Sequence, residues 1–263
     1  MTDILADLDA GRRRAASPDR AATAGWRVDA SVKAEILELF DRGGDRTFEV
    51  GPLAFADRAS LPLKRLHDGV DARAARDAGR PWRIVPGGTS LRAGAHLEPG
   101  GVVMPPSFVN VGAWIGAGTM IDSHVLVGSC AQIGARVHLA AGVVIGGVLE
   151  PPGARPVIVE DDVFVGGGCG LYEGVLVGRG AVLAAGVTLT GTSRLFDLVR
   201  ERVIEGTADA PLVVPERAVV VPGTRAVDGS FGREHGLGVA TALIVKDRDA
   251  GTDARVALEA ALR

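Results

Sequence analysis

The feature that most constrains this chain is an aliphatic residue that recurs every six positions through its middle. Eleven consecutive positions spaced by six, from Val85 to Ile145, are all Val, Ile or Leu. The register breaks over residues 150–156, a segment with three prolines. It resumes at Val159 and continues for seven positions to Leu195. Chance does not produce two such runs with one interruption, so the period reflects a repeated structural unit.

A strict period of six predicts a parallel β-helix from about Val85 to about Leu195, within a domain that we place at residues 83–223. A helical period of 3.6 does not fit, and a sheet with alternating faces would show a period of two. Each hexapeptide supplies one short strand and one corner, and three of them close a triangular coil. Gly often follows the aliphatic residue, as at Gly116 and Gly128, where a small residue permits a tight corner. About six coils at a strand spacing of ~4.8 Å predict a stack roughly 30 Å tall.

Composition agrees with a tightly wound core and excludes several classes of protein. Of the 263 residues, 47% are hydrophobic and 37 are Gly, whereas only 4% are aromatic. The net charge of −3 and the lack of a basic run argue against binding to nucleic acid. No uncharged apolar stretch is long enough to span a membrane, and the start lacks an apolar signal core. We therefore expect a cytoplasmic protein in which Cys130 and Cys169 are reduced thiols.

The flanking segments lack the six-residue period. Residues 1–82 are predicted to form a small helical cap over the first coil, with one helix over Ala30–Gly43 that Ser31 caps. The charged, Ala-rich segment Asp57–Gly79 is also expected to be partly helical. Residues 224–263 form a C-terminal extension, in which residues 223–238 read as a polar loop, Val239–Lys246 as a strand and Asp253–Arg263 as a helix.

Several strings within the repeat are more specific than the period. They are Asn110-Val-Gly-Ala-Trp114, Gly118-Thr-Met-Ile-Asp122, Val127-Gly-Ser-Cys-Ala-Gln-Ile-Gly134, Ile145-Gly-Gly-Val-Leu-Glu-Pro151 and Ile158-Val-Glu-Asp161. Together they resemble the tetrahydrodipicolinate N-succinyltransferase family. The resemblance is dense over residues 83–191, is recognisable again over 213–246 and is poor over 1–80.

The resemblance implies a left-handed β-helix that forms a homotrimer, with active sites in grooves between subunits. The family transfers succinyl from succinyl-CoA to the amino group of a cyclic or ring-opened dicarboxylate in lysine (diaminopimelate) biosynthesis, and no permanent cofactor or metal is implied. The loop at residues 150–156 would help to cover the CoA groove. Two alternatives stay open: a relative that acylates a different amino acid, with succinyl-CoA or acetyl-CoA, and a non-catalytic trimeric scaffold.

Amide formation from a thioester needs a neutral amine, a base that accepts its proton and a donor for the oxyanion. By the resemblance, Asp122 would bind the substrate amine and accept that proton, and Arg83 would hold a substrate carboxylate. His124 lies two residues past Asp122, so we expect it on the same side of a strand, where it would contact substrate and assist proton transfer. The alternative for Asp122 is a corner residue that bonds local backbone, and for Arg83 a surface residue at a domain edge.

The chain departs from the family at one corner. The family reads Ala-Arg-Ser-Glu-Val-Val-Glu-Gly where this chain reads Gly167-Gly-Cys-Gly-Leu-Tyr-Glu-Gly174. Gly168, Cys169 and Gly170 thus stand in place of Arg, Ser and the family's catalytic Glu, and Glu173 is expected to face elsewhere. The loss of a guanidinium and a carboxylate implies a changed acceptor, a changed mechanism or lost activity.

Cys169 invites the hypothesis of an acyl-accepting nucleophile, but a small residue that fills a coil corner is the favoured interpretation. His124, His138 and Cys130 lack the spacing of metal ligands, so no metal site is expected. For CoA, the resemblance places backbone amides near Ala185 and Gly186 in the groove, with Thr192 and Ser193 nearby. Arg194 and Lys246 are the expected phosphate partners.

Overall fold

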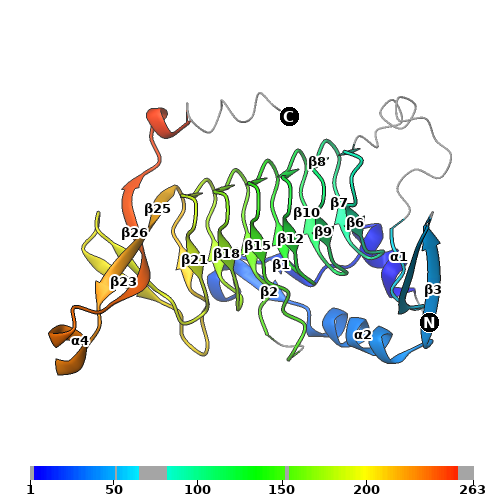
Figure 1. Cartoon of the computed structure of the whole chain (residues 1–263), viewed down its shortest axis with the longest axis horizontal. Coiled ribbons are helices and arrows are strands. Elements are labelled where there is room, and N and C mark those ends of the chain that lie inside the picture. Colours follow the sequence, from blue (N-terminus) through cyan, green and yellow to red (C-terminus); the bar gives the residue numbers. More distant parts are fainter. Residues whose placement is uncertain (1–2, 51, 65–81, 152–153, 254–263) are drawn as a thin grey trace.

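The computed structural model describes residues 3–50, 52–64, 82–151 and 154–253, and its central part is a parallel β-helix (Figure 1). Nearly every strand of the coils is two residues long and pairs in parallel with the strand three further along the chain. Three sheets therefore form the sides of the prism. The predicted triangular coil of three hexapeptides is confirmed.

Each sheet takes one strand from every coil. Sheet I contains β6 (Ser90–Leu91), β9 (Phe108–Val109), β12 (Leu126–Val127), β15 (Val144–Ile145), β18 (Gly170–Leu171) and β21 (Thr188–Leu189). Sheet II contains β7 (His96–Leu97), β10 (Trp114–Ile115), β13 (Gln132–Ile133), β16 (Ile158–Val159), β19 (Leu176–Val177) and β24 (Val213–Val214). The coil strands of sheet III are β5 (Arg83–Ile84), β8 (Val102–Val103), β11 (Met120–Ile121), β14 (His138–Leu139), β17 (Phe164–Val165), β20 (Val182–Leu183) and β25 (Ala218–Ala226).

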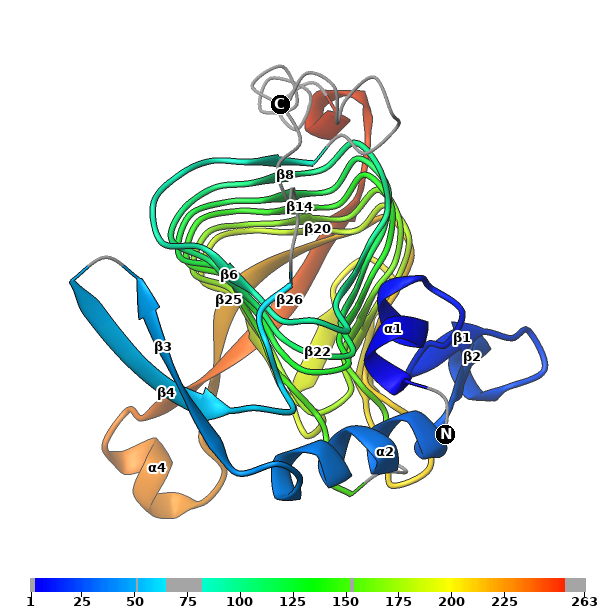
Figure 2. The same cartoon turned by 90° about the vertical axis from the view of Figure 1, so that its right-hand side faces the viewer.

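The coils wind in the left-handed sense. Figure 2 looks along the axis from the first coil, with sheet III (β8, β14, β20) at the top and sheet I (β6) at the left. The chain runs from sheet III to sheet I and then to sheet II, which is anticlockwise in this view, while it recedes from the viewer. The handedness that the resemblance implied is therefore observed.

The recurring aliphatic residues form the core. The second residue of each coil strand points inward, and from Leu91 onward nearly all of these side chains are buried in one continuous cluster. At the first coil, however, Ile84 and not Val85 aligns with Val103, so the predicted start is wrong by one residue. The step from Ile84 to Leu91 is one residue longer because the corner at Pro86-Gly87-Gly88 takes up the extra residue.

The far end of the repeat also differs from the prediction. Leu195 is buried in the core, but its strand β22 (Arg194–Asp197) leaves the coil. It pairs with β23 (Arg202–Glu205) in a hairpin and with β26 (Gly238–Asp247), both of which extend sheet III. The coil resumes at β24, so the repeat has a second interruption that the spacing of six did not reveal.

The N-terminal segment mixes helices and strands and is not purely helical as expected. It contains α1 (Ile4–Asp9), β1 (Ala16–Pro18), a 3-10 turn (Thr23–Gly25), β2 (Trp26–Val28), α2 (Ala30–Asp41), β3 (Asp45–Val50) and β4 (Leu53–Arg58). Helix α2 packs along an edge of the prism, where Ile36 shares a core with Val111 and Cys130. Its cap is Asp29, whose carboxylate accepts the backbone N–H groups of residues 31 and 32, so the prediction of Ser31 was wrong.

Two other expectations about the flanks were tested only in part. Of the segment Asp57–Gly79, the described residues 57–64 include the end of strand β4 and no helix, and residues 65–79 lie outside the described part. In the C-terminal extension, β25 and α4 (Ser230–Glu234) occupy part of the expected loop, and β26 confirms the expected strand. The helix predicted over Asp253–Arg263 lies, apart from Asp253, outside the described residues. No described helix is long and apolar enough to cross a membrane.

Arg14 anchors the N-terminal segment on the outer face of sheet II. Its guanidinium carbon lies 4.0 Å from the ring centre of Trp114 and 5.3 Å from that of Trp26. Its Nε donates a 2.6 Å hydrogen bond to Gln132 Oε1. Burial lowers the pKa of Arg14 to about 10, which leaves it charged at neutral pH. The guanidinium of Arg14 thus joins the N-terminal segment to Trp114 and Gln132, which lie on two successive coils.

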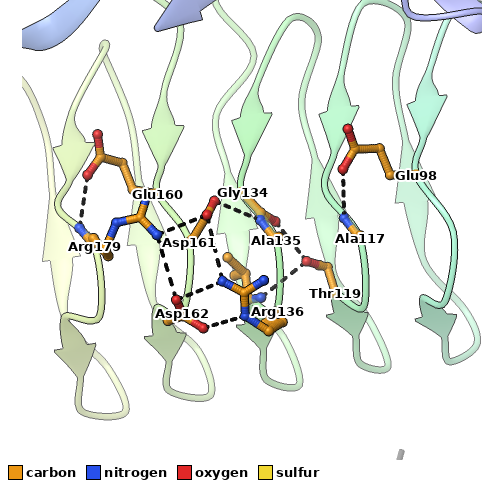
Figure 3. A network of polar contacts seen from close by, with 11 residues as sticks. Glu98, Ala117, Thr119, Gly134, Ala135, Arg136, Glu160, Asp161, Asp162 and Arg179 are labelled. Atoms are coloured by element: carbon orange, nitrogen blue, oxygen red, sulfur yellow. Dashed lines mark hydrogen bonds and ion pairs between the residues drawn. The ribbon is translucent and has the colours of Figure 1, made fainter. Parts of the chain in front are cut away.

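Charged side chains also join successive coils at the corner between sheets II and III (Figure 3). Arg136 donates two hydrogen bonds to the carboxylate of Asp162, at 2.7 and 2.9 Å. Arg179 binds Asp161 at 3.0 Å, and Asp161 also accepts the backbone N–H of Ala135. The bond from Ala135 gives a partner to a corner backbone N–H group, and the side-chain bonds tie successive coils together.

The pair of Arg136 and Asp162 predicts a pH-dependent stability. The hydrogen bonds from Arg136 hold the pKa of the Asp162 carboxyl below its ordinary value. A lowered pKa in the folded state stabilises the fold above the unfolded-state pKa of about 3.9, and this contribution disappears as the pH falls through the folded-state pKa. We expect Asp162→Asn to lower the free energy of unfolding by at most ~1 kcal/mol near pH 7, because the pair is partly exposed. The difference in Tm from wild type should shrink below about pH 4.

The control is Asp45→Asn, which removes an exposed ion pair with Arg58 in the β3–β4 hairpin. It should leave Tm nearly unchanged at both pH values. Thermal unfolding at pH 7 and pH 3 measures both variants, and an Asp162→Asn deficit of equal size at the two pH values would contradict the prediction.

Candidate functional site

The outer face of sheet I and its two corners carry the candidate site. The first residue of each strand points outward here, and on successive coils these residues are Ser90, Phe108, Leu126, Val144, Gly170 and Thr188. Three hollows lie along this face. We name them the His124 pocket, the α2 groove and the β21–β26 groove, with volumes of about 330, 780 and 570 Å³.

Asp122 lies at the corner that leads from sheet III into sheet I. It is half-buried, and its Oδ1 accepts the backbone N–H of Ser123 at 2.7 Å. Its backbone carbonyl accepts the hydroxyl of Ser107 at 2.8 Å. Among the described residues, Oδ2 of Asp122 has no hydrogen-bond partner. One oxygen therefore fixes the corner, as the local interpretation expected, and the other is free to receive a proton.

Arg83 lies apart from this carboxylate, whereas His124 lies at the same corner. His124 is exposed at the same corner, with a left-handed φ of 60°, and lines the His124 pocket. Neither it nor Asp122 belongs to a strand, so the expected alternation along a strand was wrong. Arg83 is exposed on β5, two coils before β11, which corresponds to about 10 Å of sheet spacing. No hydrogen bond or ion pair joins Arg83 to Asp122 within the described chain.

Most of the residues expected to bind CoA lie together in the β21–β26 groove. Gly186, Thr192, Ser193 and Arg194 all line it, together with Thr188 and Thr190. Ala185 is exposed beside Gly186 but does not line the groove. Lys246 lies outside it, and its Nζ is held 2.7 Å from Asp249. Arg194 is paired with Glu205 at 2.6 Å across the β22–β23 hairpin.

Sequence reasoning missed a second arginine in this groove. Arg225 lines the groove from β25, where it stands opposite Val239 of β26. Its nearest acid, the exposed Asp228, is 3.9 Å away, so its guanidinium is weakly paired. Only the long-range pairing of β25 with β26 brings Arg225 beside the coil, and the six-residue period carries no signal of that pairing.

The corner that departs from the family has an inert thiol. Cys169 points into the core, where it is buried, and its Sγ lies 3.1 Å from the carbonyl oxygen of Ala184. Burial raises the pKa of this thiol. The favoured interpretation of a small core residue is therefore confirmed, and the nucleophile hypothesis is wrong, because a buried neutral thiol is a poor nucleophile.

Other residues of this corner face the α2 groove. Glu173 lines the groove, and its Oε2 accepts the backbone N–H of Gly191 at 3.1 Å. Tyr172 lines it too, together with Leu37 and Phe40 of α2. Across the described part of the chain, no three His, Cys, Asp or Glu side chains are grouped as metal ligands.

A left-handed prism of hexapeptide coils, with a free corner carboxylate and a groove lined by hydroxyls and arginine, defines the class of hexapeptide-repeat acyltransferases. Two family models match the coils: "Bacterial transferase hexapeptide (six repeats)" over residues 112–147 and "Hexapeptide repeat of succinyl-transferase" over residues 156–191. The second segment includes the altered corner at residues 168–170, and the predicted loop at residues 150–156 lies almost wholly between the two segments.

The particular family follows from curated relatives named 2,3,4,5-tetrahydropyridine-2,6-dicarboxylate N-succinyltransferase. The one from Methylobacterium sp. (strain 4-46) is 40% identical over 98% of this chain and 87% of its own length. The one from Rhodopseudomonas palustris (strain BisB5) is 43% identical over 97% of this chain and 86% of its own length. The chain belongs to this family.

Solved structures resemble the chain less closely. A putative 2,3,4,5-tetrahydropyridine-2-carboxylate N-succinyltransferase from Campylobacter jejuni is 17% identical, with a TM-score of 0.37 over 72% of this chain and 46% of its own. Soybean serine acetyltransferase is 27% identical, with a TM-score of 0.31 over 43% of this chain and 40% of its own. The family assignment rests on the sequence relatives.

The burial of both cysteines predicts that the native protein has no fast-reacting thiol. Cys130 and Cys169 are buried, and burial raises the pKa of Cys130 to about 12 and that of Cys169 above its ordinary value. We expect an aromatic disulfide reagent at pH 8 to release almost no chromophore from the folded protein and two equivalents in denaturant. One equivalent released rapidly from the folded protein would show that a thiol is accessible.

Proposed function

We propose that this protein transfers succinyl from succinyl-CoA to the amino group of tetrahydropyridine dicarboxylate, as its relatives are named. The observation that carries the proposal is identity of about 40% over nearly the whole chain. The β21–β26 groove supports it, since it gathers four of the residues expected to contact CoA. We further propose a cytoplasmic homotrimer, in which Arg83, Asp122 and His124 of one subunit face the groove of the next and contact substrate.

In this proposal the residues of the chain divide the work of amide formation. Water opens the ring of the substrate, a cyclic imine, to give a ketone and a free amine. This amine attacks the thioester carbon, and the Oδ2 of Asp122 accepts the proton that the nitrogen loses. The carbon–sulfur bond then breaks, and the sulfur of CoA takes up that proton and leaves as a thiol. Arg225 and Arg194 hold phosphates of CoA, and Thr188, Thr192 and Ser193 border its path. No bound cofactor or metal is needed for these steps.

The test is an assay of thiol release with succinyl-CoA or acetyl-CoA and either tetrahydrodipicolinate or 2-aminopimelate. We expect release with succinyl-CoA and tetrahydrodipicolinate. Binding of CoA without turnover of either acceptor would overturn this choice of acceptor. It would support the second candidate, a relative with a different amine substrate, which Gly168 and Gly170 favour. If the protein does not bind CoA, the remaining alternative is a non-catalytic trimeric scaffold.

The free carboxylate oxygen of Asp122 predicts a strong effect of Asp122→Asn. The amide keeps an oxygen that can accept the N–H of Ser123 but cannot take a proton from the amine. We expect kcat to fall by ~10²- to 10⁴-fold, with the oligomer unchanged in size-exclusion chromatography. Turnover equal to that of wild type would remove Asp122 from the role of base.

Arg225, which lines the groove, and Lys246, which does not, predict different effects of substitution on acyl-CoA binding. Arg225→Ala removes a weakly paired guanidinium from the groove, so we expect Kd for succinyl-CoA to rise ~10-fold. Lys246→Ala is the matched control, because Lys246 lies outside the groove and is paired with Asp249. Isothermal titration calorimetry of both variants tests this assignment. A larger rise in Kd for Lys246→Ala than for Arg225→Ala would reverse it.

A further inference from the structure

Gly170 is the exception among the outward-facing residues of sheet I. The other five strands of the sheet have a side chain at this position: Ser90, Phe108, Leu126, Val144 and Thr188. At β18 the outward position is bare backbone, at the coil level where the α2 groove is lined by Tyr172 and Glu173. Another side chain can therefore occupy the space over this strand.

The ring of Tyr172 fills that space. A Cβ atom at Gly170 would lie 2.6 Å from the ring Cε2 and 2.9 Å from the hydroxyl oxygen. A Cβ at Gly146, on the preceding coil, would lie 2.9 Å from the ring Cδ1. These contacts are too short for any side chain, so two glycines on adjacent coils are required for the ring to lie here. The position of the hydroxyl is thus set by the backbone of both coils.

The hydroxyl of Tyr172 is an unused hydrogen-bond donor in the α2 groove. It has no partner among the described residues, and the side chain is only half-buried. The charged residues that line the groove in the described chain are Asp41, Glu150 and Glu173, which only accept when ionised. The hydroxyl of Thr190 also lines the groove but already lies 3.2 Å from those of Thr192 and Ser193.

The two grooves meet beside Tyr172. Thr190 lines both the α2 groove and the β21–β26 groove. It occupies the same corner as Tyr172 on the next coil, which is ~4.8 Å away. The two grooves therefore share Thr190, and a ligand in the β21–β26 groove can extend from there toward Tyr172.

We propose that the hydroxyl of Tyr172 donates a hydrogen bond to an anionic oxygen of the reacting substrates. That oxygen is either the acyl carbonyl oxygen as it becomes an oxyanion or a carboxylate of the bound substrate. This inference rests on the proposed acyl transfer and deepens it. A phenol hydroxyl can donate a hydrogen bond, whereas the Glu that the family shows at position 170 only accepts when ionised and the Val at position 172 does neither. With a donor at Tyr172 in place of that Glu, Asp122 is left to accept the proton.

The first test is Tyr172→Phe, which keeps the ring on its two glycines and removes only the donor. We expect kcat/KM to fall by ~10- to 100-fold, the range for a hydrogen bond to a charged or developing oxyanion, with Tm unchanged. A fall in kcat identifies the oxyanion, and a rise in KM for one substrate identifies its carboxylate. Unchanged kcat and KM for both substrates would overturn the proposal.

The second test is Gly170→Ala, which displaces the hydroxyl without removing it. The three nearest atoms to the new methyl group all belong to the Tyr172 ring, so the ring must move and the coil need not. We expect kcat/KM to fall about as much as in Tyr172→Phe. The double variant should show no further fall, because both substitutions act through one hydroxyl. Losses that multiply would show that Gly170→Ala acts elsewhere and would count against the proposal.

A binding measurement separates this inference from the proposed function. Tyr172 is the only tyrosine in the chain, so protein labelled with 3-fluorotyrosine has one fluorine resonance. We expect succinyl-CoA to shift this resonance and CoA without an acyl group to leave it nearly unchanged. If no acceptor is turned over but the shift occurs, the proposed acceptor fails and the inference stands. If turnover is normal and neither succinyl-CoA nor the amine substrate shifts the resonance, the inference fails and the function stands.

Discussion

The parallel hydrogen-bond ladder between coils is the interaction on which the rest of this structure depends. Each two-residue strand pairs with the strand three further along, and its inward aliphatic residue packs on the equivalent residue of the next coil. Neither contact is strong alone, because a strand this short makes few bonds. Stacking makes every coil the template of the next, so the prism is rigid along its length.

This rigidity explains how so simple a core can hold a precise site. The inward residues are nearly uniform, so differences between coils are confined to the outer faces and corners. On sheet I, Gly170 and Gly146 on two adjacent coils leave room for the ring of Tyr172, and the backbone of both coils borders it. The corner that carries Asp122 is fixed in a similar way: the backbone N–H of Ser123 donates to its carboxylate, and the hydroxyl of Ser107 donates to its backbone carbonyl.

The segments outside the repeat complete the faces that the coils leave bare. Arg14 and Trp26 cover the outside of sheet II, and α2 packs along the edge that borders the α2 groove. At the other end, β25 and β26 extend sheet III and form the far wall of the β21–β26 groove. Both grooves thus combine coil backbone with side chains from flanking segments.

The sequence alone determined the coil and the position of most of its core residues, because a period of six is a local property, set by the geometry of one strand and one corner. The family resemblance pointed to four residues that line the β21–β26 groove. The tertiary structure alone decided that Ile84 opens the series, that Leu195 leaves the coil, that Arg225 and not Lys246 lines the groove, and that Tyr172 covers Gly170. Each of these depends on contacts between coils or between distant strands, and residue spacing along the chain carries no information about them.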